Sequence, residues 1–230
     1  MKADLEPFFQ RYTQLVRVAD EAFDRIKRGH PEEVNCTEGC SDCCHAVFDV
    51  ALIEALYINA RFECAFDADT RKRLLEKANR ADREAYAMKR RVSRAVQAGD
   101  DTRQIMHVVA KQRLRCPFLN ETEQCDIYPF RPITCRTYGV PTSIQGEGHT
   151  CGRSGFTQGS KYPTLNLDRI HDQLYEISHD LVVALQSRFT GLANLFVPVS
   201  MAVLTEFDEA YLGIDTAAQN KKAAGEPTKA

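Results

Sequence analysis

The stretch CTEGCSDCCH, residues 36–45, places four cysteines within nine positions, namely Cys36, Cys40, Cys43 and Cys44. Two residues separate Cys40 from Cys43, a spacing that lets both thiolates reach one ion from a tight turn. Neighbouring side chains diverge, so Cys44 either serves a second metal or packs as a small hydrophobic side chain. We interpret this stretch as one part of a metal site around which the rest of the chain folds.

A second cysteine-rich segment begins about 70 residues later. RCPFLNETEQCDIYPFRPITCRTYG, residues 115–139, holds Cys116, Cys125 and Cys135, and Cys151 follows in GHTCGR. Eight thiols suit two four-ligand sites, one larger cluster, or one four-ligand site with spare thiols. For this chemistry the two segments have to converge in space, and we expect them to do so.

Several other residues near the cysteines are open to two interpretations. His45 and His149 adjoin cysteines and are possible ligands, although a lone histidine more often forms hydrogen bonds or faces solvent. Arg131 and Arg136 flank Cys135, and their charges could offset that of buried thiolates. The ninth cysteine, Cys64 in FECAF, lies at the end of a predicted helix, where we expect it to pack in the core.

Composition narrows the class of protein. The 230 residues carry a formal net charge of −2, so no overall attraction to nucleic acid or anionic membrane is expected. The basic residues between positions 71 and 94 are interleaved with acidic ones and predict a solvated helix face. No signal peptide or membrane-spanning run is visible, which predicts a cytoplasmic protein, where clustered cysteines bind metal or do redox work rather than form disulfides.

Hydrophobic periodicity predicts a mostly α fold, a helical domain whose Cys-rich loops and short β or turn segments clamp a metal centre. The expected helices cover residues 4–28, 49–61, 67–97, 102–113, 166–189 and 198–212. Asp49 is expected to cap the second helix and Pro198 to open the last. We expect one α-helical domain over 1–212, with a cysteine core over about 31–162, a helical insertion over about 49–113 and a mobile tail over 213–230.

The combination of motifs resembles a known family. CTEGCSDCC, followed by RCPFLN, CDIYPFRPITCR and a later cysteine, is similar to the YkgJ-type cysteine-cluster family, whose CxxCxxCC pattern is described as zinc- or iron-chelating. The resemblance implies that the metal-binding positions are Cys36, Cys40, Cys43, Cys44, Cys116, Cys125, Cys135 and Cys151. Three residues separate Cys36 from Cys40, where the pattern has two, which leaves open whether Cys36 shares a metal with Cys40. The flagellin lysine methylases resemble this family through a similar cluster.

Three functions are compatible with these features. Because thiols dominate the donor set and the first run is closely spaced, we favour an iron–sulfur cluster over zinc, with a role in redox chemistry, sensing or metal handling and an unidentified redox or protein partner. A zinc-stapled interaction protein is the first alternative. A cluster-assisted, methyltransferase-like enzyme is the second, although the sequence has no glycine-rich strand-to-helix loop for S-adenosylmethionine.

Overall fold

The computed structural model describes residues 4–101, 105, 108, 109, 112–157 and 159–215. It is about 54% helical, with strands of only two or three residues, which confirms the predicted mostly α class. The helices are α1 (Glu6–Gly29), α2 (Leu52–Ala65), α3 (Ala68–Gln97), α5 (Ile133–Thr137), α6 (Leu167–Ala184) and α7 (Met201–Leu204). The described residues also form the 3₁₀ turns η1 (Asp42–His45), η2 (Tyr128–Phe130) and η3 (Thr190–Asn194).

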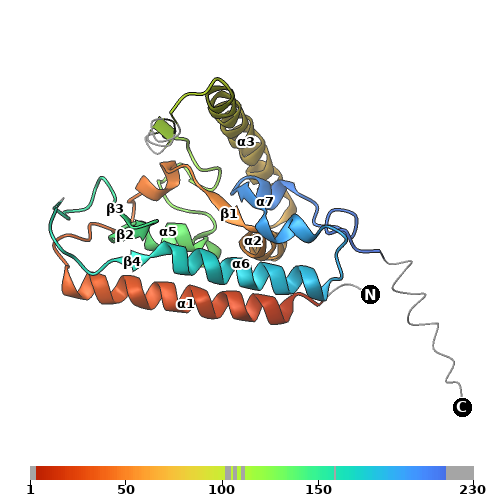
Figure 1. The fold of residues 1–230 in the computed structure, drawn as a ribbon, viewed down its shortest axis with the longest axis horizontal. Coiled ribbons are helices and arrows are strands. Elements are labelled where there is room, and N and C mark those ends of the chain that lie inside the picture. Colours follow the sequence, from red (N-terminus) through yellow and green to blue (C-terminus); the bar gives the residue numbers. More distant parts are fainter. Residues whose placement is uncertain (1–3, 102–104, 106–107, 110–111, 158, 216–230) are drawn as a thin grey trace, which may run out of the picture.

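Helices α1 and α6 lie side by side and run antiparallel along one face of the molecule (Figure 1). Both are amphipathic, and their apolar stripes meet α2 and α5 in the first hydrophobic cluster. Tyr12, Leu52, Ile133 and Leu181 lie at its centre, and each is almost fully buried. The short helix α5, which carries Cys135, is therefore seated on the main helical core.

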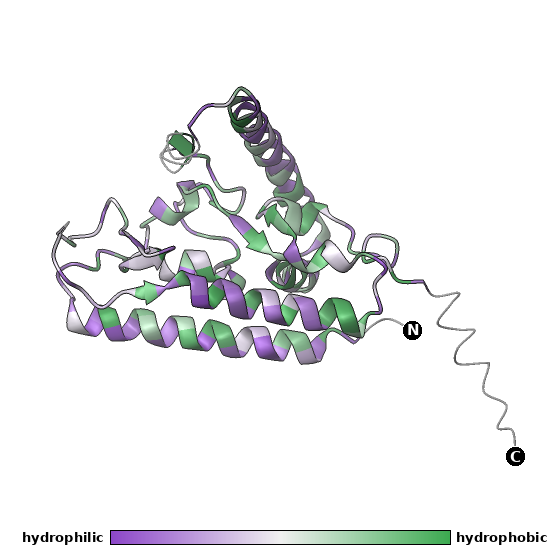
Figure 2. Cartoon of the chain, viewed as in Figure 1, coloured by the Kyte–Doolittle hydropathy of each residue, from purple (hydrophilic) through white to green (hydrophobic). Residues whose placement is uncertain are grey.

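Helix α3 extends away from this layer (Figure 1). Asp67 caps it by accepting a hydrogen bond from the Thr70 backbone nitrogen at 2.9 Å, as a helix N-cap should. Leu74 and Ala78 near its start pack in a second hydrophobic cluster with α2, α7 and the loop around Phe118. The remainder of α3 is mostly hydrophilic, in contrast to the apolar β1 and α7 nearby (Figure 2). Only the first part of the predicted charged helix is therefore anchored in this cluster.

The strands form two small sheets. β1 (Asp49–Ala51) pairs antiparallel with β5 (Phe196–Pro198), with Val50 opposite Val197. β2 (Thr142–Ile144) and β3 (Glu147–His149) form a hairpin, and β4 (Leu165–Asn166) joins β2 in parallel. Gln145 and Gly146 both have positive φ, as a two-residue hairpin turn of this twist requires. The β1–β5 pair ties a segment next to the first cysteine stretch to the far end of the chain.

Two predicted helix starts, at Asp49 and Pro198, are wrong. Both residues favour the start of a helix locally, but in the structure they pair with each other in the β1–β5 sheet. Asp49 begins β1 instead of capping a helix, and its carboxylate binds Lys89 Nζ through both oxygens at 2.7 Å. Pro198 ends β5, where its missing N–H does not break the short ladder, and α7 covers only four residues. The predicted 166–189 helix begins correctly after Asn166, but it stops at Ala184, shortly before Gln186 adopts a positive φ.

Two further predictions concern residues that are only partly described. Most of the helix expected over 102–113 lies outside the described residues, and so does 216–230 of the expected tail. Residues 213–215 are described. Gly213 accepts a hydrogen bond from the Arg188 backbone nitrogen at 3.0 Å, and Ile214 packs against the first hydrophobic cluster.

Candidate metal centre

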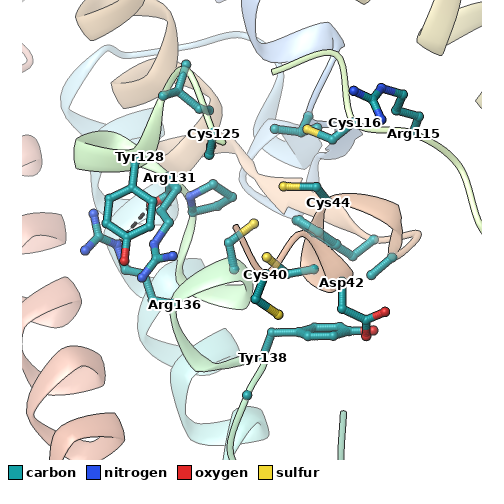
Figure 3. A pocket seen from close by; sticks show the side chains of 18 of the residues that line it. Cys40, Asp42, Cys44, Arg115, Cys116, Cys125, Tyr128, Arg131, Arg136 and Tyr138 are labelled. Atoms are coloured by element: carbon teal, nitrogen blue, oxygen red, sulfur yellow. Dashed lines mark hydrogen bonds between the residues drawn. The ribbon is translucent and has the colours of Figure 1, made fainter. Parts of the chain in front are cut away.

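One cavity of about 850 Å³ is lined by both cysteine-rich segments. Its walls include Cys36, Cys40, Cys43, Cys44, Cys116, Cys125, Cys135 and Cys151. Figure 3 shows several of these thiols around the centre of the cavity, with Tyr128, Arg131 and Arg136 to one side and Asp42 and Tyr138 below. The expected convergence of the two segments is therefore present, and all eight thiols singled out from the sequence line the same cavity.

The first segment is shaped by two tight turns. The Cys40 backbone nitrogen donates to the Thr37 carbonyl at 3.0 Å, and Gly39 takes a φ of 81°, which a side chain would disfavour. The 3₁₀ turn η1 then carries Cys43 and Cys44. Because such a turn has three residues per revolution, successive side chains point about 120° apart. The side chains of Cys43 and Cys44 therefore point toward different parts of the cavity.

Backbone pairing brings the second segment to the first. The Cys116 backbone nitrogen donates to the Cys44 carbonyl at 2.7 Å, and Ala46 forms a β-bridge with Arg113. A tight loop then pairs Leu119 with Cys125, which returns the chain toward Cys116. Backbone hydrogen bonds alone therefore bring three of the eight cysteines together, namely Cys44, Cys116 and Cys125.

Polar side chains join the two segments at the cavity rim. Ser41 Oγ donates to Glu123 Oε2 at 2.5 Å, and Gln124 Nε2 donates to Glu38 Oε1 at 2.8 Å. The same Glu123 carboxylate accepts from Arg115 at 3.1 Å, and these hydrogen bonds lower the pKa of Glu123. The residues between Cys36 and Cys43 are in this way fixed to the loop that carries Cys125.

Cys135 reaches the cavity from α5, and Cys36 from the start of the first cysteine segment. Pro132 is the N-cap residue of α5, and its carbonyl accepts a hydrogen bond from the Cys135 backbone nitrogen at 3.1 Å. Cys36 lies against the backbone of Gly139, where a Cβ would overlap with its sulfur. This glycine could not be singled out from the sequence, because the close approach of two segments becomes apparent only in the folded chain.

The thiols contact one another in pairs, and these contacts shift their pKa values. The thiols of Cys135 and Cys44 hydrogen-bond to the Cys43 sulfur, which lowers the pKa of Cys43 and raises that of Cys135. Cys44 also hydrogen-bonds to Cys116 and Cys125, which raises the pKa of Cys44. The same contact lowers the pKa of Cys125. Binding of a metal would release the protons that these thiols still carry.

The thiol of Cys151 forms a hydrogen bond with a carboxylate. Its sulfur donates to Asp42 Oδ2 at 3.2 Å, and Asp42 also binds Arg113 at 2.5 Å. Burial and this hydrogen bond raise the pKa of Cys151 to about 11. Burial alone would raise the pKa of Asp42, but the contacts with Cys151 and Arg113 outweigh it and lower that pKa. Asp42 was not singled out from the sequence, where nothing distinguishes it from other acidic residues.

The two arginines next to Cys135 have different surroundings. Arg136 is fully engaged, donating to the Arg131 carbonyl at 3.0 Å, to Asp20 at 2.9 Å and to the Pro129 carbonyl at 2.8 Å. Arg131 stacks on the Tyr128 ring, with its guanidinium carbon 3.9 Å from the ring centroid (Figure 3). Within the described ranges its buried Nε has no hydrogen-bond partner. Its charge is among the causes that lower the pKa of both Cys43 and Cys125.

Three other predicted positions lie elsewhere. Cys64 is exposed, so the prediction that it packs in the core is wrong; it follows Phe62, which occupies the buried position of that helix turn. His45 and His149 are not among the residues that line the cavity. His45 instead contacts the Ser41 carbonyl through Nδ1 at 3.1 Å, and His149 lies in β3 with its side chain exposed.

The eight thiols are suitable ligands for a metal, and they are spread over the walls of the cavity. In the part of the chain that the structure describes, no three Cys, His, Asp or Glu side chains surround a single point closely enough to hold one ion. The sulfurs instead line the walls of a cavity that Arg131 also lines, and among the described residues the buried Nε of Arg131 has no hydrogen-bond partner. Soft sulfur donors with a nearby cation suit zinc or iron, in one centre or in several.

Comparison with known families agrees with this chemistry. The model of the CxxCxxCC family, described as a putative zinc- or iron-chelating domain, matches residues 35–152, just over half of the chain. The chain belongs to the CxxCxxCC family. Its matched region begins just before Cys36 and ends just after Cys151, so it includes every cysteine of the cavity. Searches of curated proteins and of solved structures each found no match.

Among the described residues, none of the helices combines the length and the apolar character needed to cross a bilayer.

Proposed function

We propose that this CxxCxxCC protein binds its metal as an iron–sulfur cluster and serves in redox chemistry, sensing or metal handling. The observation that carries the proposal is the convergence of eight thiols from two distant segments on one cavity. Such a protein keeps its thiols available in the reducing cytoplasm, where we place it.

The spread of the sulfurs favours a cluster over a single zinc ion. Four thiolates around one zinc converge on a point about 2.3 Å from each sulfur. A cluster is larger and distributes its cysteine ligands over several irons, so the ligands lie around a volume. The walls of the cavity, in which no three donors surround one point among the described residues, suit the second arrangement.

Arg131 supplies the charge that such a cluster needs. A cluster held by thiolates is anionic, and a buried anion requires compensation. Hydrogen bonds from other cysteines are the main cause of the lowered pKa of Cys43 and of Cys125, and the charge of Arg131 acts in the same direction on both and on Cys36. When bound, an iron–sulfur cluster provides one-electron chemistry, and Arg131 would stabilise the more negative, reduced form.

Zinc remains the second candidate, because the cysteine segments have little regular structure of their own. Between Cys36 and Cys44 there is only the four-residue turn η1, and α5 has five residues. A structural zinc commonly supplies the folding free energy that such loops lack. In that case the protein would be a stapled interaction module without redox chemistry.

The deciding experiment is anaerobic purification followed by analysis of iron, zinc and acid-labile sulfide and by visible spectroscopy. Iron and sulfide in equal amounts, with a visible band that dithionite bleaches, would support the proposal. Zinc alone in a colourless protein would refute the iron–sulfur assignment and support the second candidate. Protein purified and reconstituted without retaining either metal would overturn both.

A further inference from the structure

Charge is distributed unevenly between helix α3 and the rest of the chain. The helix carries ten basic and four acidic side chains, which give it a net charge of +6. Because the whole chain has a net charge of −2, the remainder carries −8. Basic and acidic residues are interleaved only in the first part of α3, and no acidic residue occurs between Glu84 and Asp100. The near-neutral total therefore results from a basic helix on an acidic body.

Some of the basic side chains of α3 have a structural role. Arg71 binds Glu63 at the end of α2, and Lys89 Nζ binds the carboxylate of Asp49 in β1 at 2.7 Å. Both basic residues are partly buried. These ion pairs attach α3 to the body of the protein, so the charges that take part in them are not available to an external partner.

Four arginines of α3 form a separate group on its solvent side. Successive residues of an α-helix are rotated by about 100°, which places Arg80, Arg83, Arg90 and Arg94 within an arc of about 80°, opposite the buried residues of the helix. We call these four residues the arginine stripe, and it is about 21 Å long at 1.5 Å per residue. All four are exposed. Within the described part of the chain, none of their guanidinium groups has an ion pair or a hydrogen bond.

An exposed aromatic ring lies beside the arginine stripe. Tyr86 is 65% exposed. It follows Arg83 by three residues and precedes Arg90 by four, and side chains at these spacings are neighbours on a helix. The surface therefore presents a flat ring next to two guanidinium groups that have no partner among the described residues.

We propose that the arginine stripe and Tyr86 bind single-stranded nucleic acid, with the guanidinium groups on successive phosphates and the tyrosine ring stacked on a base. The planar guanidinium can donate two parallel hydrogen bonds to one phosphate, which makes arginine well suited to this contact. Stacking on an aromatic side chain requires a base whose face is accessible, as in a single strand. The proposal concerns a surface outside the cysteine-lined cavity and does not depend on the metal.

The shape and charge of the molecule favour this partner over two other anionic ones. A helix that binds a membrane surface needs an exposed apolar face, but the apolar side of α3 is buried in the protein. An acidic polypeptide would neutralise the arginines and leave Tyr86 without a role. Helix α3 also extends away from the layer of α1 and α6 (Figure 1), so a strand along it avoids much of the acidic body.

The first test measures the affinity of the full chain for single strands by fluorescence anisotropy at several salt concentrations. The probes are labelled, mixed-sequence RNA and DNA strands of about 16 nucleotides, the upper end of a typical site. In a plot of log affinity against log salt concentration we expect a slope of about −3, because each phosphate contact on a single strand contributes about −0.7. Absence of binding to both strands at low salt, or an affinity that does not depend on salt, would overturn the proposal.

Charge-matched variants locate the binding surface. Arg83→Gln/Arg90→Gln/Arg94→Gln should weaken binding about 10- to 100-fold and reduce the slope to about −1. The matched control, Arg17→Gln/Arg25→Gln/Arg28→Gln, removes the same charge from exposed positions of α1 and should bind nearly as tightly as the wild type. Glutamine favours helix, so circular dichroism should be unchanged in both. Equal losses in two folded variants would overturn the assignment to the arginine stripe.

The second test separates a single strand from other polyanions. Tyr86→Ala should weaken single-strand binding about 5- to 100-fold, whereas Tyr86→Phe should retain it. Wild-type binding to a duplex of the same length, to poly-glutamate and to phosphatidylserine vesicles should be weaker than to the single strand. Equal or tighter binding to any of these three, or full binding by Tyr86→Ala, would overturn the proposal. Metal content should be the same in all variants, so failure of this proposal would leave the proposed metal binding intact.

Discussion

The Cys36 sulfur lies directly against the backbone of Gly139, in space that a Cβ at this position would occupy. Cys36 belongs to the first cysteine segment, and Gly139 follows α5, which carries Cys135. The contact therefore fixes the spacing between two walls of the cavity. Three residues separate Cys36 from Cys40, one more than in the family pattern. The contact with Gly139 nevertheless gives Cys36 a defined position.

Replacing this glycine should weaken metal binding. In Gly139→Ala the new methyl group would displace the Cys36 sulfur, and we expect zinc affinity to fall by about 10- to 100-fold, as when a ligand is poorly oriented. Competition with a chromophoric chelator measures the affinity. Gly148→Ala is the matched control, because nothing lies within 4 Å of a Cβ there. Equal affinities in the two variants would contradict the proposed role of Cys36.

The cysteine thiols themselves provide a direct test of the ligand set. Cys40→Ser and Cys43→Ser should each lower the metal content per chain and the midpoint of thermal unfolding, because metal binding and folding of these loops are coupled. Cys64→Ser should leave both unchanged, since this thiol is exposed and is not part of the cavity wall. Full metal content in both of the first two variants would exclude them as ligands.

Much of this arrangement could be predicted from the sequence, for reasons that are local. Apolar residues at helical spacing identified α1, α3 and the start of α6, and clustered thiols identified the lining of the cavity. The pairing of β1 with β5 could not be predicted, because Asp49 and Pro198 are distant in sequence and each has a strong local preference for a helix start. Gly139 and Asp42 were missed for a related reason, since their importance depends on which segment packs against them.

Buried Glu54 links three parts of the fold, and its removal should destabilise the protein. Its carboxylate accepts from the backbone nitrogens of Ile133 at 3.0 Å and Ala51 at 3.2 Å, and from Tyr12 Oη at 3.4 Å. In Glu54→Gln the amide NH₂ would face a backbone donor, and leaving such a group unpaired costs about 1–3 kcal/mol. Chemical denaturation measures the loss of unfolding free energy. Glu84→Gln, on the exposed face of α3, should cost far less.

The same carboxyl group should make stability depend on pH. Burial raises the pKa of Glu54 above its ordinary value of 4.5, although its hydrogen-bond donors counter part of the shift. The folded protein therefore holds this proton more tightly than the unfolded chain, so the stabilisation is complete below about pH 4.5 and is lost as pH rises through the folded pKa. The unfolding free energy of the wild type minus that of Glu54→Gln should fall across this window. A difference that is constant or rises with pH would contradict the raised pKa.

Arg131 and Arg136 should respond differently to substitution. If the cluster is iron–sulfur, Arg131→Gln should lower its reduction potential, because a nearby cation favours the reduced state; an effect of about 1 kcal/mol corresponds to roughly 40 mV for one electron. Arg131→Lys should retain most of the wild-type potential. Arg136→Gln removes donors to Asp20 and to two carbonyls, so we expect mainly lower stability. Spectroelectrochemistry and thermal unfolding separate the two effects, and an unchanged potential in Arg131→Gln would exclude its proposed role.

The distance in sequence between the walls of the cavity has a consequence for biosynthesis. Cys36 and Cys116 are 80 residues apart, and Pro198, Val199 and Ser200 complete the lining. At roughly 5–20 residues per second, the ribosome adds Cys116 several seconds after Cys36, and the last wall later still. During that interval the first four thiols are exposed on the growing chain without their partners. Metal can therefore be enclosed only after residue 200 has left the ribosome, so metal delivery during synthesis would have to wait for nearly the whole chain.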